Sequence, residues 1–131
     1  MSGRRRPQDR DRGALTLSYV IIVPVFLAAV MVIVQASLWY LARQAALAAA
    51  RQGADAARVL DATPGAGPRA ALEFARSAGS GYLLSPAATA AGSTATTIQL
   101  RVTGRVPSLV PGLVISISQV VQAPVERFTT P

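Results

Sequence analysis

The feature that constrains this chain most is a charge-free interval between Arg12 and Arg43, GALTLSYVIIVPVFLAAVMVIVQASLWYLA. About 20 consecutive apolar residues span a bilayer core as a helix, and this interval is longer than that. Tyr19 lies near its start and Trp39 near its end, where aromatic rings suit the two membrane–water interfaces. The sequence therefore predicts a transmembrane helix near Tyr19–Tyr40.

The flanking arginines predict how this helix is oriented. Residues 1–12 contain Arg4, Arg5, Arg6, Arg10 and Arg12, whereas the opposite flank has three arginines over a longer stretch, Arg43, Arg51 and Arg58. The positive-inside rule places the N-terminus in the cytoplasm and residues 43–131 outside the cytoplasmic membrane, which the chain crosses once. A cleaved secretory signal is the alternative, since residues 48–50 are all alanine. The apolar run here is, however, about twice as long as the apolar region of a usual secretory signal peptide, which has 7–15 residues.

The expected organisation has three parts, and the expected fold class is α+β. Residues 1–13 form a basic cytoplasmic leader, and residues 14–62 form the transmembrane helix and its Ala-rich extension, which continues as a rod until Thr63-Pro64-Gly65. Residues 63–131 form a small extracytoplasmic α+β domain. Pro24 should kink the long helix because its ring removes one backbone hydrogen bond.

The Ala-rich extension has one face of small residues. Its members recur at helical spacing and are Leu47, Ala50, Ala54 and Ala57. Small side chains let helices approach closely, so this face predicts a helix–helix interface. Two partners stay open at this point, a helix of another subunit or the protein's own soluble domain.

The remaining sequence predicts one short helix and two strands. Pro68 suits the start of the helix and Gly79 its end. Residues 80–95 are loop-like, with a possible strand at 82–84. Apolar and polar residues alternate in Thr97–Val106, as in a half-buried strand, and Val114–Val125 gives a second strand that Pro124 confines to an edge. An antiparallel pair alone is marginally stable, so it should pack against the long helix or a partner.

Composition argues against catalysis and against nucleic-acid binding. The chain has no cysteine and no histidine, and its carboxylates show no spacing typical of acid–base work. No glycine-rich phosphate loop is present. We therefore expect no enzyme activity, no cofactor, no metal and no small-molecule substrate. Residues 1–13 hold five of the thirteen arginines, and the remaining eight face four acids and form no folded basic face with aromatic residues beside it, so nucleic acid is not an expected partner.

The start of the apolar interval resembles a type IV pilin-like processing site. Gly13, four residues, then Ser18-Tyr19 and later Pro24 resemble TadE-type pseudopilins of the tight-adherence (Flp) pilus systems. The stretch LARQAALAAARQGADAARV and the ending VTGRVPSLVPGLVISISQVVQAPVERF also resemble TadE-like proteins, in particular those of high-GC actinobacteria. The resemblance implies a prepilin peptidase that cuts between Gly13 and Ala14. It also implies a role as a minor pseudopilin or membrane-bound assembly component of a pilus or related secretion system, with other pilin subunits and the assembly platform as partners.

Ser18 departs from the family pattern, which has a glutamate there. In pilins that glutamate can pair with the new N-terminal amine of a neighbouring subunit, and a charge in the membrane needs such a pair. Ser18 is neutral, so we expect weaker stacking along a filament and a role at the tip, in priming or in assembly. The alternative function is an uncleaved single-pass membrane protein whose small outer domain binds a partner.

Overall fold

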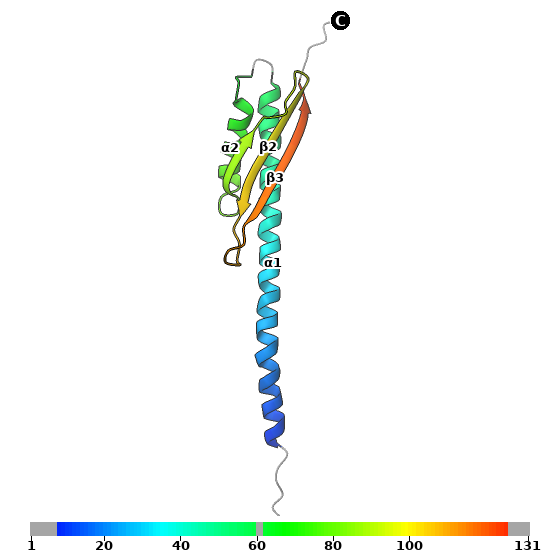
Figure 1. Ribbon diagram of the computed structural model, residues 1–131, viewed down its shortest axis with the longest axis vertical. Coiled ribbons are helices and arrows are strands. Elements are labelled where there is room, and N and C mark those ends of the chain that lie inside the picture. Colours follow the sequence, from blue (N-terminus) through cyan, green and yellow to red (C-terminus); the bar gives the residue numbers. More distant parts are fainter. Residues whose placement is uncertain (1–7, 60–61, 126–131) are drawn as a thin grey trace, which may run out of the picture. The chain divides into compact units, whose positions relative to one another are not determined.

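The computed structural model describes residues 8–59 and 62–125, so Arg4, Arg5 and Arg6 of the predicted leader lie outside the described residues. The chain divides into two compact units, Met1–Val34 and Gln35–Pro131. The elements in chain order are α1 (Gln8–Arg58), α2 (Ala66–Ala78), β1 (Leu84–Thr89), β2 (Thr97–Val106) and β3 (Ile115–Pro124) (Figure 1). We call the described part of the second unit, residues 35–59 and 62–125, the head. The α+β fold class is confirmed.

Helix α1 contains the whole predicted membrane segment. It is helical from Gln8 to Arg58 and includes Pro24 without an interruption of the helix, while the expected kink stays a prediction. Within the first unit, the large apolar side chains from Leu17 to Val34 are exposed, as a lipid-facing helix requires. The part that begins at Thr16 is the one helix among the described residues that is long and apolar enough to cross a membrane, with a mean hydropathy of 2.8 over an 18-residue window.

The head contains a three-stranded antiparallel sheet in the order β1-β2-β3. Strand β2 has the predicted bounds, and β3 begins and ends within a residue of the predicted second strand. β2 and β3 pair along their full lengths, from Thr97 opposite Pro124 to Val106 opposite Ile115. Pro124 ends an edge strand, which is where a residue without a backbone N–H is tolerated.

The prediction of a loop over residues 80–95 is wrong for its middle, because β1 occupies Leu84–Thr89 there. Its sequence LSPAAT has little of the β-branched and aromatic content that is typical of strands. The pairing with β2 is irregular between Leu84 and Ala87, around Pro86, and Ser85 has a positive φ of 48°. β1 is therefore an edge strand that is stabilised by its pairing with β2. The pattern of apolar and polar residues within β1 itself does not predict a strand.

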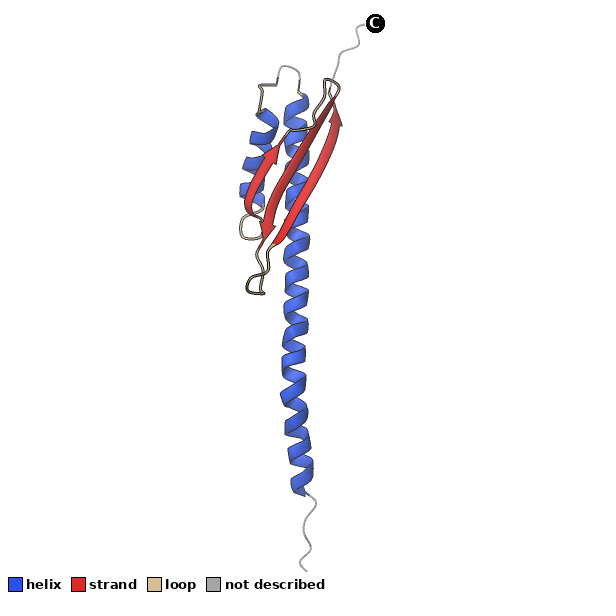
Figure 2. Ribbon diagram, in the orientation of Figure 1, coloured by secondary structure: helices blue, strands red, loops and turns tan. Residues whose placement is uncertain are grey.

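The core of the head lies where α1 and α2 pack on one face of the sheet (Figure 2). The buried side chains that helix α1 contributes to it are all alanines, among them the fully buried Ala42, Ala46 and Ala49, and the partly buried Leu38 packs against this core. The sheet supplies the larger side chains, with Leu100 and Val102 as the largest that are fully buried. Small residues on the helix and larger ones on the strand let the two layers approach closely and still fill the space between them.

Candidate processing site and interaction surfaces

The candidate processing site lies in the first unit, inside α1. Gly13 is exposed, and no atom lies within 4 Å of the position that a Cβ on it would take. The side chain of Ala14, on the other side of the candidate scissile bond, is not among those described. Because α1 begins at Gln8, the bond after Gly13 is helical in the intact chain.

The other residues of the motif follow on the same helix. Ser18 and Tyr19 are exposed, and Pro24 lies one to two turns further on. Their apolar neighbours from Leu17 to Val34 are exposed. An exposed apolar surface of this size indicates contact with lipid or with other helices. The motif therefore lies on a surface that a second transmembrane helix could contact.

The predicted small-residue face lies in the head, and part of it belongs to the protein's own core. Ala50 and Ala54 are buried in the protein's own core, while Leu47 and Ala57 are half-buried. The two buried alanines are thus covered by α2 and the sheet and are closed to a neighbouring subunit's helix. Outside this core, Asp55 forms an ion pair with Arg58 at 3.3 Å, as the spacing of these residues predicts.

Gly53 allows α2 to pack against α1. A Cβ on Gly53 would lie 2.6 Å from the carbonyl oxygen of Gly67 and 2.7 Å from Cβ of Ala71, and it would overlap the side chain of Leu100. A side chain at position 53 would therefore push both α2 and β2 away from α1. The glycine is needed for this close approach rather than for backbone freedom, since it lies inside a helix.

Gln35 is an interaction residue that the motif reading of the sequence missed. Its side-chain amide bonds to the β2–β3 loop, which comprises residues 107–114: Nε2 donates to the carbonyl oxygen of Pro107 at 3.1 Å, and Oε1 accepts from the N–H of Leu109 at 2.9 Å. The sequence did contain a signal for this contact, because Gln35 is the one long polar side chain in the charge-free interval between Arg12 and Arg43. Such a group needs a hydrogen-bond partner in an apolar environment.

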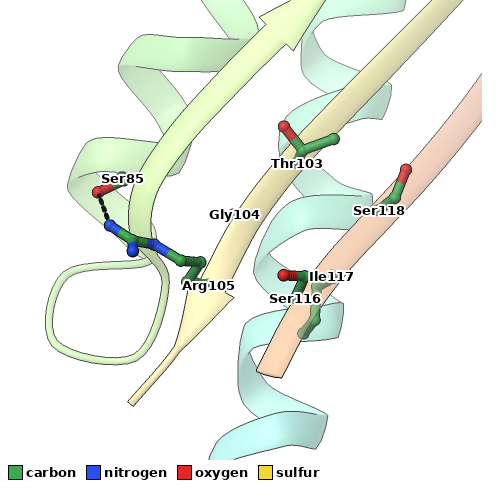
Figure 3. Close-up of a pocket in the computed structure, with 7 residues that line it drawn as sticks. All are labelled: Ser85, Thr103, Gly104, Arg105, Ser116, Ile117 and Ser118. Atoms are coloured by element: carbon green, nitrogen blue, oxygen red, sulfur yellow. Dashed lines mark hydrogen bonds between the residues drawn. The ribbon is translucent and has the colours of Figure 1, made fainter. Parts of the chain in front are cut away.

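A surface pocket that could hold a small molecule lies over β1, β2 and β3 (Figure 3). Its lining combines the hydroxyls of Ser85, Thr103, Ser116 and Ser118 with Gly104, Arg105 and Ile117. Arg105 donates from Nη2 to Ser85 Oγ at 3.1 Å. The lining holds no carboxylate or imidazole that could act as a general base. Among the described residues, no three His, Cys, Asp or Glu side chains cluster as a metal site would require.

Over residues 8–59 and 62–125, these features define a class of protein with one apolar helix near the N-terminus, suited to a single-pass membrane anchor, and a small α+β head. Residues 13–55 match the family of TadE-like proteins, so the recognition of a TadE-like N-terminal segment is confirmed. Proteins of this family are structural or assembly components of tight-adherence pili and are not known as enzymes. Neither the comparison with curated proteins nor that with solved structures found a match. The actinobacterial type stays a prediction.

Proposed function

We propose that this chain is a minor pseudopilin or a membrane-bound assembly component of a tight-adherence pilus or related secretion system, processed after Gly13. The observation that supports this most directly is the TadE-like match, which begins at Gly13 and extends to residue 55. The match thus covers the candidate cut, the apolar helix and most of the small-residue face. The apolar surface from Leu17 to Val34 supplies the contact area that packing among pilin helices would use.

The proposed cut requires a local opening of α1. A peptidase reads an extended backbone, whereas the bond after Gly13 is helical in the intact chain. Glycine destabilises a helix interior by about 1 kcal/mol relative to alanine, so Gly13 lowers the cost of unwinding at that point. It also lets the backbone approach the enzyme closely, because the residue has no side chain.

The mature N-terminus tests the proposal. The chain is co-expressed with its cognate prepilin peptidase, and its N-terminus is determined by mass spectrometry. We expect a chain that starts at Ala14, and we expect Gly13→Leu to accumulate with residues 1–13 still attached. Gly3→Leu, a second glycine of the leader, is the matched control and should be cut as the wild type is.

An intact N-terminus in the wild type would contradict the processing step, provided that the peptidase cuts a major pilin in the same cells. The chain would then fit an uncleaved single-pass membrane protein with a partner-binding head.

The proposed topology has its own test, since the peptidase acts on the cytoplasmic side and the head lies outside. The chain has no natural cysteine, so single cysteines report on accessibility without a background. A membrane-impermeant maleimide should label Thr94→Cys in intact spheroplasts and should label Ser2→Cys only after lysis, in cells without the peptidase. The reverse pattern would overturn the orientation.

A further inference from the structure

The β2–β3 loop exposes an apolar patch that the proposed function does not use. The exposed fractions of its aliphatic side chains are 38% for Leu109, 55% for Val110, 49% for Leu113 and 66% for Val114. The sequence from Val106 to Val125 contains no charged residue. By contrast, residues 90–96, which connect β1 to β2 at the other end of the sheet, are Ala, Gly, Ser and Thr. An exposed patch of this kind indicates an interaction surface.

Gln35 fixes the loop at a particular level of α1. It bonds to the backbone of both Pro107 and Leu109, so the loop lies beside this residue. A span of about 20 residues centred in the charge-free interval covers roughly residues 18–37, which includes position 35. Further along the helix, the guanidinium of Arg43 lies over the ring of Trp39, 5.5 Å from its centroid, an arrangement that suits the interface. At 1.5 Å per residue, Gln35 is about 6 Å on the membrane side of Trp39.

Several polar groups of the loop backbone have hydrogen-bond partners within the protein, which suits a water-poor environment. The N–H of Leu109 donates to Gln35, and the N–H of Val110 donates to Ser108 Oγ at 3.1 Å. Ser108 Oγ donates in turn to the carbonyl oxygen of Val110 at 3.1 Å, and the N–H of Leu113 donates to the same oxygen at 3.2 Å. The two prolines of the loop have no N–H at all. Backbone groups left unpaired in lipid cost several kcal/mol each, so each of these pairings lowers the cost of insertion.

We propose that the β2–β3 loop inserts its aliphatic side chains into the bilayer that α1 spans, at the boundary between headgroups and acyl chains. Lipid is the occupant because the loop is hydrogen-bonded to Gln35 of α1, which lies within the predicted membrane span. The head then has a second membrane contact besides α1. This inference depends on α1 crossing a membrane and is independent of any cut after Gly13.

Site-specific fluorescence tests this contact on the full chain. Single cysteines are introduced at Val110 in the loop, at Thr94 at the other end of the sheet and at Phe26 in α1, and each is labelled with bimane. Each variant is reconstituted at one chain per nanodisc containing phosphatidylethanolamine and phosphatidylglycerol. Quenching by aqueous iodide and by lipids with a nitroxide near the headgroup is then compared. Leu113→Cys serves as a second loop position.

We expect the Val110 and Leu113 labels to be quenched by the nitroxide lipid and to be at least 3-fold less sensitive to iodide than the Thr94 label. The Phe26 label confirms in the same discs that α1 is in the bilayer. With that label in lipid, iodide quenching at Val110 equal to that at Thr94 would overturn the proposal. A Val110 label that neither quencher reaches would also overturn it, because the protein itself would then cover the loop.

Discussion

Gly67 of α2 lies against the backbone of Gly53 of α1, and each of the two glycines occupies the place where the other would have a side chain. A Cβ on Gly67 would lie 3.0 Å from the carbonyl oxygen of Gly53, and a Cβ on Gly53 would lie 2.6 Å from the carbonyl oxygen of Gly67. The helices therefore meet backbone to backbone, which brings Leu100 of β2 within reach of both. This contact sets the spacing of the layers in the head.

Gly53→Ala should destabilise the head although alanine is the better helix former. The helix-propensity gain of about 1 kcal/mol is outweighed by overpacking, which typically costs about 1–3 kcal/mol in a tight core. We expect a lower free energy of unfolding in urea, measured on the full chain in detergent by the fluorescence of Trp39, the protein's one tryptophan. The exposed neighbour Gln52→Ala should change it by less than about 0.5 kcal/mol. Equal or greater stability of Gly53→Ala would contradict the close contact.

Leu100→Ala should reduce stability more than any single truncation on the outer face of the sheet. Leu100 is fully buried between the sheet and the helices, so its removal leaves a cavity and should cost about 2–5 kcal/mol. Val120→Ala on β3, where 38% of the residue is exposed, is the matched control and should cost under about 1 kcal/mol. The same urea titration measures both, and similar losses would argue against the described core.

Gln35→Met should free the β2–β3 loop without unfolding the head. Methionine keeps the length of the side chain but removes the hydrogen bonds to Pro107 and Leu109. Two such bonds contribute about 1–3 kcal/mol, so the amide of Leu109 should exchange its hydrogen on the order of 10-fold faster or more. Hydrogen exchange measured by NMR on the full chain in micelles tests this. Gln44→Met, an exposed position of α1, should leave that rate unchanged.

Ser18→Glu should increase incorporation into filaments if the proposed pseudopilin role is correct. The introduced carboxylate could pair with the N-terminal amine of a neighbouring subunit cut after Gly13, and such a pair favours docking in the membrane. We expect more of the variant than of the wild type in sheared filaments, quantified by immunoblot. Thr16→Glu puts the same charge two residues away and should not have this effect. A wild-type protein that is already abundant along the filaments would contradict the expected weak stacking.

Features with a local periodic signal were predictable from the sequence. The charge-free interval predicts the apolar helix, and the alternation in Thr97–Val106 predicts β2 with its observed bounds. Gly79 ends α2 as expected from its place after an Ala-rich segment. In each case one short window of sequence contains the physical cause of the element, because an apolar face or a helix stop is defined by neighbours along the chain.

Features that depend on distant partners were not predictable in this way. Strand β1 has weak strand propensity around Pro86 and forms because β2 offers it an edge. The contact of Gln35 joins residues more than 70 positions apart in the sequence. The sequence shows that Gln35 needs a polar partner and that the β2–β3 loop is apolar, but only the fold brings the two together.

The alanines of α1 have a consequence for how proteins of this kind can diverge. The matched segment, residues 13–55, includes Ala42, Ala46 and Ala49, which form one wall of the head's interior. The C-terminal part of α1 and the sheet therefore form one packing unit and are not separate modules. A chimaera that keeps α2 and the sheet but takes a foreign helix with bulkier residues at these positions could not pack the helix on the sheet as closely, so substitutions in the helix and in the sheet would have to arise together.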